Sequence, residues 1–396
     1  MSTMVFEVMQ ETAQEAVIKV IGVGGGGCNA IDNMIDNNVR GVEFICANTD
    51  AQALKRNRAS QKLQLGNNLT KGLGAGANPE VGRSAALEDR ERIAEMLRGS
   101  NMVFVTAGMG GGTGTGAAPV VAEVARELGI LTVGVVTRPF DHEGKRQKVA
   151  QNGIEDLKKH VDSLIVIPNE KLMEVLGEDV TMREAFRAAD DVLKGAVAGI
   201  AEVITCPGLI NVDFADVRTV MGEMGLAMMG SAYASGIDRA RVAAEQAVAS
   251  PLLDNITLEG ARGVLVNIST APGCLKMSEY REIMGIVRHY ADDEAQIKFG
   301  TAEVEDMPED TIRVTLIATG LGSAKKAAPR EERPEYIKIV KTGTDDRVGD
   351  TLNYDDFDTP AIMRQRGRRT PTSTDFSNPE VSESYDIPAF LRKQAD

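Results

Sequence analysis

Two glycine-rich segments restrict most strongly what this chain can fold into, because each stands between an apolar run and a helical pattern. IGVGGGGCNA at 21–30 follows the apolar run 17–23, and GMGGGTGTG at 108–116 follows the run 102–106. Runs that are apolar throughout are typical of parallel strands buried on both faces, and a helix after each strand predicts a doubly wound α/β sheet. We therefore expect both glycine segments at the carboxyl edge of one parallel sheet, where ligands bind.

The alternation of strands and helices predicts an N-terminal domain over residues 17–180. Besides the two strands above, it consists of apolar runs at 42–47, 131–137 and 163–167 and helical patterns near 29–37, 79–97, 119–128 and 146–160.

A long helix is predicted over residues 181–206. Thr181 and Glu184 have the spacing of a capping box, and apolar residues then recur at helical spacing until Pro207 and Gly208. Because apolar residues cover much of its circumference, we expect this helix to be buried between two domains. Residues 207–321 form the second domain, of α/β or α+β type, with strands near 263–270, 296–304 and 311–319 and helices near 239–249 and 278–291.

Both ends of the chain lack the pattern of a packed core. Residues 1–16 are interpreted as a flexible N-terminus. Residues 322–380 mix charged residues, Thr and Pro with few consecutive apolar residues, which predicts a disordered linker. Apolar residues return in the final YDIPAFLRKQAD, so residues 381–396 are interpreted as a partner-docking peptide on a long tether.

Composition argues against several classes of function. The net charge of −14 and the absence of Trp disfavour general binding of nucleic acid, which needs an excess of Lys and Arg or a stacking platform. No run approaches the roughly 18 apolar residues of a membrane span, so no direct membrane insertion is predicted. The four cysteines are scattered without a CxxC pair, which favours a reduced, cytoplasmic setting.

The glycine segments point to a phosphate ligand. Gly22, Gly24 and Gly27 satisfy the dinucleotide fingerprint G-x-G-x-x-G, and Asp50 after the next strand supplies its acid. A third glycine-rich stretch at 72–79 also leads into a helix. A dinucleotide fold needs one such loop, whereas several converging loops favour a polyphosphate held by backbone N–H groups. A nicotinamide-dependent oxidoreductase and a nucleotide-binding regulator that never assembles remain as alternatives.

A short acidic segment is the candidate for hydrolytic chemistry. Asn211, Asp213 and Asp216 lie in one six-residue segment shortly after the predicted long helix, and two carboxylates with an amide can position a water molecule. Asp213 has a second interpretation as the N-cap of the following helix. The residues alone leave both interpretations open.

Several of these segments together resemble one family. GMGGGTGTG is very close to the tubulin-type phosphate-binding signature, and with VIGVGGGGCNA, NTDAQAL, KGLGAGANPEVG, NVDFADV and the terminal DIPAFLRKQAD the chain is similar to the FtsZ family of bacterial tubulin homologues. The resemblance covers about residues 17–321 and the last dozen. It implies a tubulin-like fold with a parallel-sheet GTP-binding domain, a long central helix and a smaller α+β C-terminal domain. It also implies a cytoplasmic, self-assembling GTPase of cell division at mid-cell, using GTP/GDP and Mg²⁺.

The resemblance also assigns residues to the nucleotide site. Phe186 would stack on the base, although it also fits a core position of the helix. Asp190, or alternatively Asp191, would accept the donors of guanine, and Glu143 with Arg146, or alternatively Lys145, would bind the ribose side. The phosphates and the rest of the nucleotide would contact Gly25, Gly26, Gly27, Cys28, Asn29, Asn48, Ala75, Gly76, Ala77, Gly111, Gly112, Thr113, Gly114, Thr115, Gly116 and Asn169.

By the same resemblance, catalysis would be shared between subunits. Asp213 and Asp216, assisted by Asn211, would polarise the attacking water on the GTP of the next subunit in a head-to-tail polymer. No dedicated carboxylate cage stands out, so no protein ligand of the metal is predicted. Residues 385–396 would engage membrane-tethering and regulatory division proteins.

Overall fold

The computed structural model describes residues 16–321 except 178, 207, 223–224, 251, 253–260 and 292–294. The predicted flexible N-terminus before residue 16, the linker 322–380 and the docking peptide 381–396 lie outside the described residues.

The N-terminal half alternates strands with helices. Its strands are β1 (Ile18–Val23), β2 (Glu43–Asn48), β3 (Gln61–Gln64), β4 (Met102–Gly108), β5 (Leu131–Arg138) and β6 (Ser163–Pro168). Its helices are α1 (Gly24–Asp36), α2 (Ala51–Arg56), α3 (Asn67–Thr70), α4 (Pro79–Glu88), α5 (Arg90–Leu97), α6 (Thr113–Glu127), α7 (Lys145–Leu157) and α8 (Asn169–Leu176), with a 3₁₀ turn η1 (Asp141–Glu143).

The order of the strands confirms the predicted doubly wound sheet. Strands β1 to β6 are parallel and lie in the order β3-β2-β1-β4-β5-β6. The chain proceeds from β1 outward to β3 and then returns to place β4 on the other side of β1. This reversal is a topological switch point, and ligands of open α/β sheets bind beside such a point at the carboxyl ends of the strands. Both glycine segments begin there, directly after β1 and β4.

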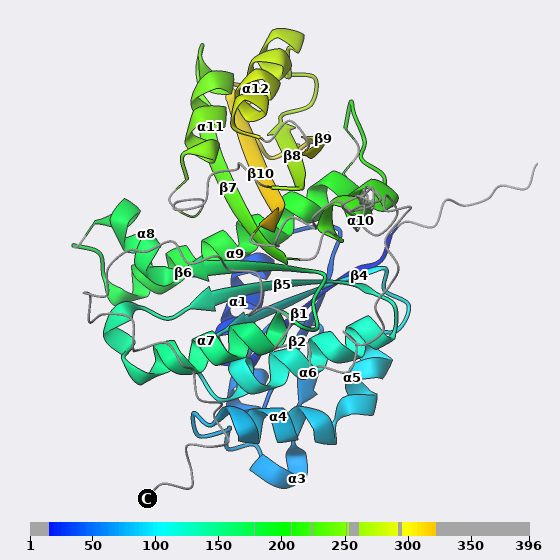
Figure 1. Ribbon diagram of the computed structural model, residues 1–396, viewed down its shortest axis with the longest axis vertical. Helices are drawn as coiled ribbons and strands as arrows, with labels where there is room; N and C mark the ends of the chain where they lie inside the picture. The colour runs from blue at the N-terminus through cyan, green and yellow to red at the C-terminus, as the bar shows by residue number, and fades with distance from the viewer. Residues whose placement is uncertain are drawn as a thin grey trace, which may run out of the picture. The chain divides into compact units, whose positions relative to one another are not determined.

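Alternate residues of the parallel strands enter two cores. Val20 and Phe104 belong to the core shared with α1 and the long helix, whereas Ile21 and Val105 belong to the core beneath α4, α5, α6 and α7. Figure 1 shows these two groups of helices on opposite faces of the sheet. Strands covered on both faces explain why the sequence shows continuous apolar runs rather than alternation.

The long helix α9 (Met182–Thr205) begins as its capping pattern predicts. The Glu184 N–H donates to the Thr181 hydroxyl, and the Glu184 carboxylate accepts from the Thr181 N–H at 2.9 Å. Farther along, the Asn267 amide donates to the Gly199 carbonyl at 3.2 Å, and Arg313 forms an ion pair with Glu202. Helix α9 therefore packs against α1 at one end and against the C-terminal strands at the other.

The C-terminal half continues the same sheet. It contains α10 (Phe214–Met221), β7 (Gly225–Ser235), α11 (Arg239–Val248), β8 (Gly263–Thr270), α12 (Met277–Tyr290), β9 (Gln296–Glu303) and β10 (Thr311–Leu321). Strand β7 pairs in parallel with β6 and antiparallel with β10, and the order continues as β7-β10-β8-β9. The described strands thus form one ten-stranded sheet, which the sequence did not predict because β7 was not recognised.

Two helices begin earlier than the sequence predicts. Helix α1 begins at Gly24 rather than near residue 29, and α6 begins at Thr113 and contains Pro119 instead of starting there. Glycine is a poor helix former, so its run was interpreted as loop. The glycines are helical because these first turns are packed against each other, as described below. Among the described residues, no helix is long and apolar enough to cross a membrane.

Candidate functional site

The two glycine segments are in direct backbone contact. A Cβ atom on Gly24 would stand 2.7 Å from the Gly114 nitrogen, and one on Gly26 would stand 3.1 Å from the Gly108 Cα. Only glycine fits such an approach, and Gly24 also has a positive φ of 73°. The glycines therefore bring the first turns of α1 and α6 together at the switch point.

The third glycine stretch joins the same place. A Cβ on Gly112 would lie 2.9 Å from the Asn78 nitrogen, and one on Gly82 in α4 would lie 2.4 Å from the Gly112 carbonyl oxygen. The hydroxyl of Thr49, which follows β2, hydrogen-bonds the hydroxyl of Thr113 at 2.6 Å. Segments from four parts of the chain thus converge at one edge of the sheet.

Helices α1 and α6 both begin without a side-chain cap. Neither Val23 nor Gly112, their N-cap residues, makes a side-chain hydrogen bond to the first turn, and neither first turn contains an acidic residue. The first N–H groups of a helix lack intrahelical partners and carry partial positive charge. Two such ends beside each other form an anion-binding site suited to a chain of phosphates.

Four glycines of these stretches face open space. A Cβ built on Gly25, Gly74, Gly76 or Gly111 meets no atom within 4 Å. Gly74 and Gly76 have positive φ values of 90° and 60°, which favour glycine, whereas neither packing nor backbone conformation requires a glycine at 25 or 111. Ala77 beside them has the unusual positive φ of 59°, which costs conformational energy in a residue other than glycine. A strained loop and unfilled glycines are both typical of a surface shaped for a ligand.

Arg146 and Glu143 lie at the rim of the glycine loop. The two side chains form an ion pair, and the Arg146 Nε donates to the Gly110 carbonyl at 3.4 Å. The Glu143 carboxylate also accepts from the Phe140 N–H at 2.9 Å. Lys145 is exposed and has no such contact with the loop. The geometry therefore favours Arg146 over Lys145 as the basic residue of this rim.

The first turns of α9 present an aromatic ring and a carboxylate one turn apart. Phe186 is 43% exposed, with its ring 5.5 Å from that of Phe140, so its interpretation as a core residue is wrong. Asp191 accepts hydrogen bonds from Asn33 of α1 and from Lys194, whereas Asp190 has no such partner among the described residues. Desolvation by burial, with the charge of Asp191, raises the pKa of Asp190 to about 7. Asp190 is thus the carboxylate left available for a ligand.

The remaining predicted residues of α1, β2 and α8 lie around this site. Asn29 is exposed between Gly25 and Asn33, on the face of α1 that meets α9. Asn48 and Cys28 are buried, and they lie 4.0 Å apart at Nδ2 and Sγ. Asn169 is buried at the start of α8, and its amide oxygen has no hydrogen-bond partner among the described residues. Such an orphaned acceptor is consistent with a missing donor, such as a ligand or water.

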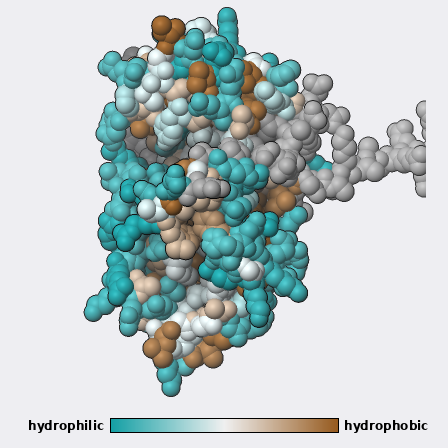
Figure 2. Space-filling model, turned by 90° about the vertical axis from the view of Figure 1, so that its left-hand side faces the viewer, coloured by the Kyte–Doolittle hydropathy of each residue, from teal (hydrophilic) through white to brown (hydrophobic). Residues whose placement is uncertain are grey.

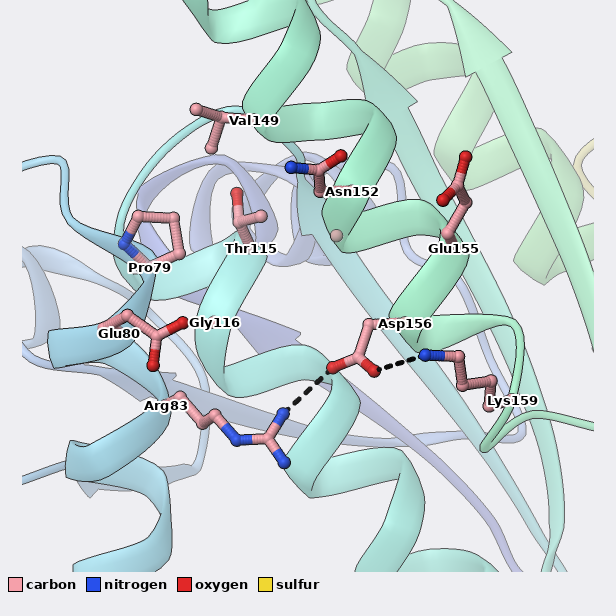
Figure 3. Close-up of a pocket in the computed structure, with 11 residues that line it drawn as sticks. Pro79, Glu80, Arg83, Thr115, Gly116, Val149, Asn152, Glu155, Asp156 and Lys159 are labelled. Atoms are coloured by element: carbon pink, nitrogen blue, oxygen red, sulfur yellow. Dashed lines mark hydrogen bonds and ion pairs between the residues drawn. The ribbon is translucent and has the colours of Figure 1, made fainter. Parts of the chain in front are cut away.

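Thr115 and Gly116 take part in the packing of α6 against its neighbours. The Thr115 hydroxyl accepts from the Gly110 N–H at 2.8 Å, and a Cβ on Gly116 would overlap the Pro79 carbonyl oxygen at 1.9 Å. Both residues line a cavity of about 400 Å³ between α4, α6 and α7, shown in Figure 3, which the Arg83–Asp156 ion pair of 2.9 Å crosses. This cavity lies among the helices and not at the open edge where Gly25 and Gly111 face, so a nucleotide contact of Thr115 and Gly116 stays a prediction.

Asp50, the acid of the dinucleotide fingerprint, has a local structural role. Its carboxylate caps α2 by accepting from the Gln52 and Ala53 N–H groups at 2.8 and 3.2 Å. In a dinucleotide site the acid at this position binds ribose hydroxyls. The capping of α2 therefore accounts for an acid at this position without a ribose contact.

The acidic segment lies at the opposite edge of the sheet. Arg218 of α10 donates to the carbonyl of Gly129, which lies two residues before β5, so α10 stands at the amino ends of the parallel strands. Figure 1 shows α8 and α10 on opposite sides of the sheet. Helix α9 connects the edge with the glycine loops to the edge with the acidic segment. It has 24 residues, which corresponds to a length of about 36 Å. Asp213 and Asp216 therefore do not meet the glycine loops of their own chain.

Both interpretations of Asp213 remain compatible with its geometry. Its Oδ1 accepts from the Asp216 N–H at 2.7 Å and caps α10, as the local pattern predicts. Its side chain is nevertheless exposed, and its other oxygen has no partner among the described residues. Asn211 is exposed as well and accepts from the Gly208 N–H at 2.9 Å. The segment thus offers a rigid, solvent-facing pair of carboxylates with an amide beside them.

Sequence reasoning missed several residues of the site. Thr49 holds Thr113, and the carbonyl of Thr137 accepts from the Met109 N–H at 3.0 Å, which fixes the start of the glycine loop. Both threonines follow or end parallel strands, so their position at the carboxyl edge was available as a signal. In the part of the chain that the structure describes, no three His, Cys, Asp or Glu side chains are grouped to hold a metal ion.

Comparison with known proteins identifies relatives over nearly the whole chain. The model of the Tubulin/FtsZ family GTPase domain matches residues 17–177, and that of the FtsZ family C-terminal domain matches residues 225–322. The cell division protein FtsZ of Neisseria gonorrhoeae is 61% identical over 393 residues, which are 98% of each chain. The cell division protein FtsZ of Pseudomonas aeruginosa is 55% identical, and the match covers 99% of this chain and 100% of that protein.

Solved structures agree with these relatives. An empty FtsZ dimer from M. jannaschii superposes with a TM-score of 0.75 at 46% identity, covering 78% of this chain and 90% of that one. A GTPγS-bound protofilament of CetZ2 from Haloferax volcanii superposes with a TM-score of 0.66 over 77% of this chain and 93% of that one. At 19% identity, this second likeness shows the fold alone.

Substitution of the open glycines separates ligand binding from folding. Gly25→Ala and Gly111→Ala should not lower the melting temperature without nucleotide, because the added methyl group meets nothing. The increase in melting temperature on adding GDP should shrink, because the methyl occupies space that the phosphates need. Gly26→Ala is the control, because its methyl would press on Gly108 and lower the melting temperature even without nucleotide. A full GDP response in both open-site variants would contradict this interpretation.

Proposed function

The chain belongs to the FtsZ family of tubulin-like cell-division GTPases, and from this premise we propose that it assembles head to tail and hydrolyses GTP at the contact between subunits. The observation that carries the proposal is the separation of its two sets of polar residues. The glycine loops bind a polyphosphate but contain no group placed to activate water, and the carboxylates of Asp213 and Asp216 lie at the other end of α9.

The nucleotide pocket would combine phosphate, ribose and base contacts at the switch point. The first turns of α1 and α6 would bind the phosphates through N–H groups, with Gly25, Gly76 and Gly111 giving the room for close approach. Arg146 and Glu143 would contact the ribose side, and Phe186 would stack on the base. The remaining contacts with the nucleotide would come from Asn29, Asn48 and Asn169. Asp190 would select guanine, because a carboxylate accepts from the N1 and amino hydrogens and has no donor for adenine N1.

The chemical step would then depend on a second subunit. One oxygen of Asp213 and one of Asp216 remain free to accept from a water molecule, and Asn211 can donate to it, which orients its lone pair toward the γ-phosphate. Mg²⁺ would be held by the phosphates and water, since Mg²⁺ keeps several waters and needs no all-protein cage. When bound, it would neutralise charge on the phosphates.

Exposed apolar residues at both ends support the head-to-tail contact. Leu73, within the glycine stretch 72–79, is 86% exposed, and Leu69 of α3 is 52% exposed. Figure 2 views the side of the sheet where α8 lies and shows hydrophobic residues gathered at its lower end, where Figure 1 places α3. At the other end Leu209 is 67% exposed beside the acidic segment. Two different surfaces that pair between copies without closing generate a filament.

The proposal extends to the setting of the polymer. Residues 385–396 would dock on membrane-tethering and regulatory division proteins, since a short apolar run, Ile387 to Leu391, stands directly before the basic Arg392 and Lys393, which suits a peptide that enters an apolar groove. The protein would act in the cytoplasm at mid-cell, on the inner face of the membrane but not inserted in it, and without nucleic acid as a partner.

Asp213→Asn should abolish GTP turnover and leave nucleotide binding intact. Asparagine caps a helix as well as aspartate does, so α10 should remain stable while the negative charge is lost. Turnover should fall at least about a hundredfold, measured as phosphate release against protein concentration, with GDP affinity measured by calorimetry. In the wild-type protein the rate per subunit should rise with protein concentration. A concentration-independent rate, or loss of GDP binding in the variant, would refute the shared site.

Nucleotide affinity should fall as the pH is lowered through neutrality. The pKa of Asp190 is about 7 without nucleotide, and guanine requires the ionised form, so the competent fraction and the GDP affinity should fall about tenfold between pH 8 and pH 6. The Asp190→Asn variant should bind GDP more weakly, and its GDP affinity should lack this part of the pH dependence. Any pH dependence that remains in the variant comes from other groups, including the nucleotide itself, and is subtracted from the wild-type profile. An unchanged pH profile in the variant would exclude Asp190 as the base reader.

A further inference from the structure

The edge strand β9 carries a lysine in contact with the acidic segment. The Lys298 Nζ lies 2.7 Å from Oδ1 of Asp216, and the two side chains are 36% and 39% exposed. Lys298 stands in the middle of β9, and Asp216 stands in the first turn of α10. Nothing in the local sequence around either residue indicates this pairing.

The pleat of β9 explains why Lys298 faces the acidic segment. Phe299 packs toward α12, where its ring lies 5.2 Å from that of Tyr280. Because successive side chains of a strand point to opposite faces, Lys298 and Gly300 share the other face. A Cβ on Gly300 would stand 2.9 Å from the Val212 side chain, so this face of β9 is the one on which the acidic segment is seated.

The backbone of the segment is fixed to the same strand. The Thr301 N–H donates to the Ile210 carbonyl at 3.0 Å, and the Ile210 N–H donates to the Thr301 hydroxyl at 2.9 Å. Val212 is buried between β9 and α9. Strand β9 therefore fixes the main chain at Ile210, ahead of the two carboxylates in the sequence. The side chain of Asp216 is fixed separately, by Lys298.

The ion pair also changes the charge that the segment presents. Two carboxylates that approach a triphosphate meet like charge, which is unfavourable at short distance. An ammonium group bound to one of them compensates one negative charge and leaves the second oxygen of Asp216 free among the described residues. An oxygen so directed can accept from a water molecule in one orientation instead of several.

We infer that Lys298 is a positioning residue of the shared hydrolytic site: by binding Oδ1 of Asp216 it directs the other carboxylate oxygen toward the attacking water and lowers the repulsion between the acidic segment and the triphosphate of the next subunit. This inference rests on the proposed function. Lys298 acts through Asp216 and does not itself contact the reacting atoms.

A lysine on an edge strand also has a simpler explanation, protection of the strand from pairing with other chains. The sheet offers a matched control for it, because its other edge strand, β3, carries the exposed Lys62. Lys62→Met and Lys298→Met remove the same charge from the two edges. Protection would make the two variants behave alike, whereas positioning affects Lys298 alone.

The test compares full-length wild-type protein with Lys298→Met, Lys298→Arg and Lys62→Met. GTP turnover is measured by phosphate release, polymer by sedimentation, and GDP affinity by calorimetry. In Lys298→Met the rate per assembled subunit should fall about tenfold, with GDP affinity unchanged because the nucleotide pocket is at the other end of the subunit. Lys298→Arg should restore most of the rate, and Lys62→Met should match the wild type.

Three results would overturn the inference: an unchanged rate per assembled subunit in Lys298→Met, an equal loss in Lys62→Met, or no recovery in Lys298→Arg. Lys298→Gln provides a second neutral variant if the methionine variant aggregates. Failure of the proposed function itself is recognised separately. In that case wild-type turnover per subunit would not depend on protein concentration, and Asp213→Asn would retain activity.

Discussion

Backbone contact between glycines in the first turns of α1, α4 and α6 is the constraint on which the rest of the site depends. Gly24 touches Gly114, and Gly82 touches Gly112, at separations that no side chain would permit. This contact brings the uncapped ends of α1 and α6 to a single point beside the β1–β4 switch. One helix end contributes only about 0.3–1 kcal/mol toward an anion in exposed settings. Several ends at one place are needed to hold a triphosphate.

The second constraint is the length of α9. Its first turns carry Phe186 and Asp190 at the nucleotide pocket, and its last turns lead to the acidic segment on the opposite side. The helix is tied to α1 through Asn33 and Asp191 and to the C-terminal strands through Glu202 and Arg313. A helix held at both ends acts as a spacer of constant length. The binding half and the hydrolytic half of the site are thus kept apart within a subunit, and a polymer is the arrangement that joins them.

Sequence patterns predicted the N-terminal half well because its signals are local or strictly periodic. Buried parallel strands read as apolar runs, and the capping pattern of Thr181 and the N-cap of α10 at Asp213 depend on residues three positions apart. The convergence of the glycine segments followed from topology alone, since the carboxyl ends of parallel strands share one edge.

Features that depend on tertiary placement were not predictable. Strand β7 is rich in Gly, Ala, Ser and Met, which have weak preference for strands, and it is extended because β6 and β10 flank it. Thr115 and Gly116 belong to the glycine signature and also make packing contacts, Thr115 with Gly110 and Gly116 with Pro79, which only the folded chain brings together. The pairing of Lys298 with Asp216 joins segments that only the folded C-terminal half brings together.

The most direct test of the shared site mixes two inactive variants. Asp213→Asn subunits keep an intact nucleotide pocket, and Gly111→Asp subunits keep an intact acidic segment but repel the triphosphate. Neither should hydrolyse GTP alone. In an equal mixture about a quarter of the contacts would join an intact pocket to an intact acidic segment, so turnover should recover toward that share of the wild-type rate. A mixture that assembles but remains inactive would contradict catalysis between subunits.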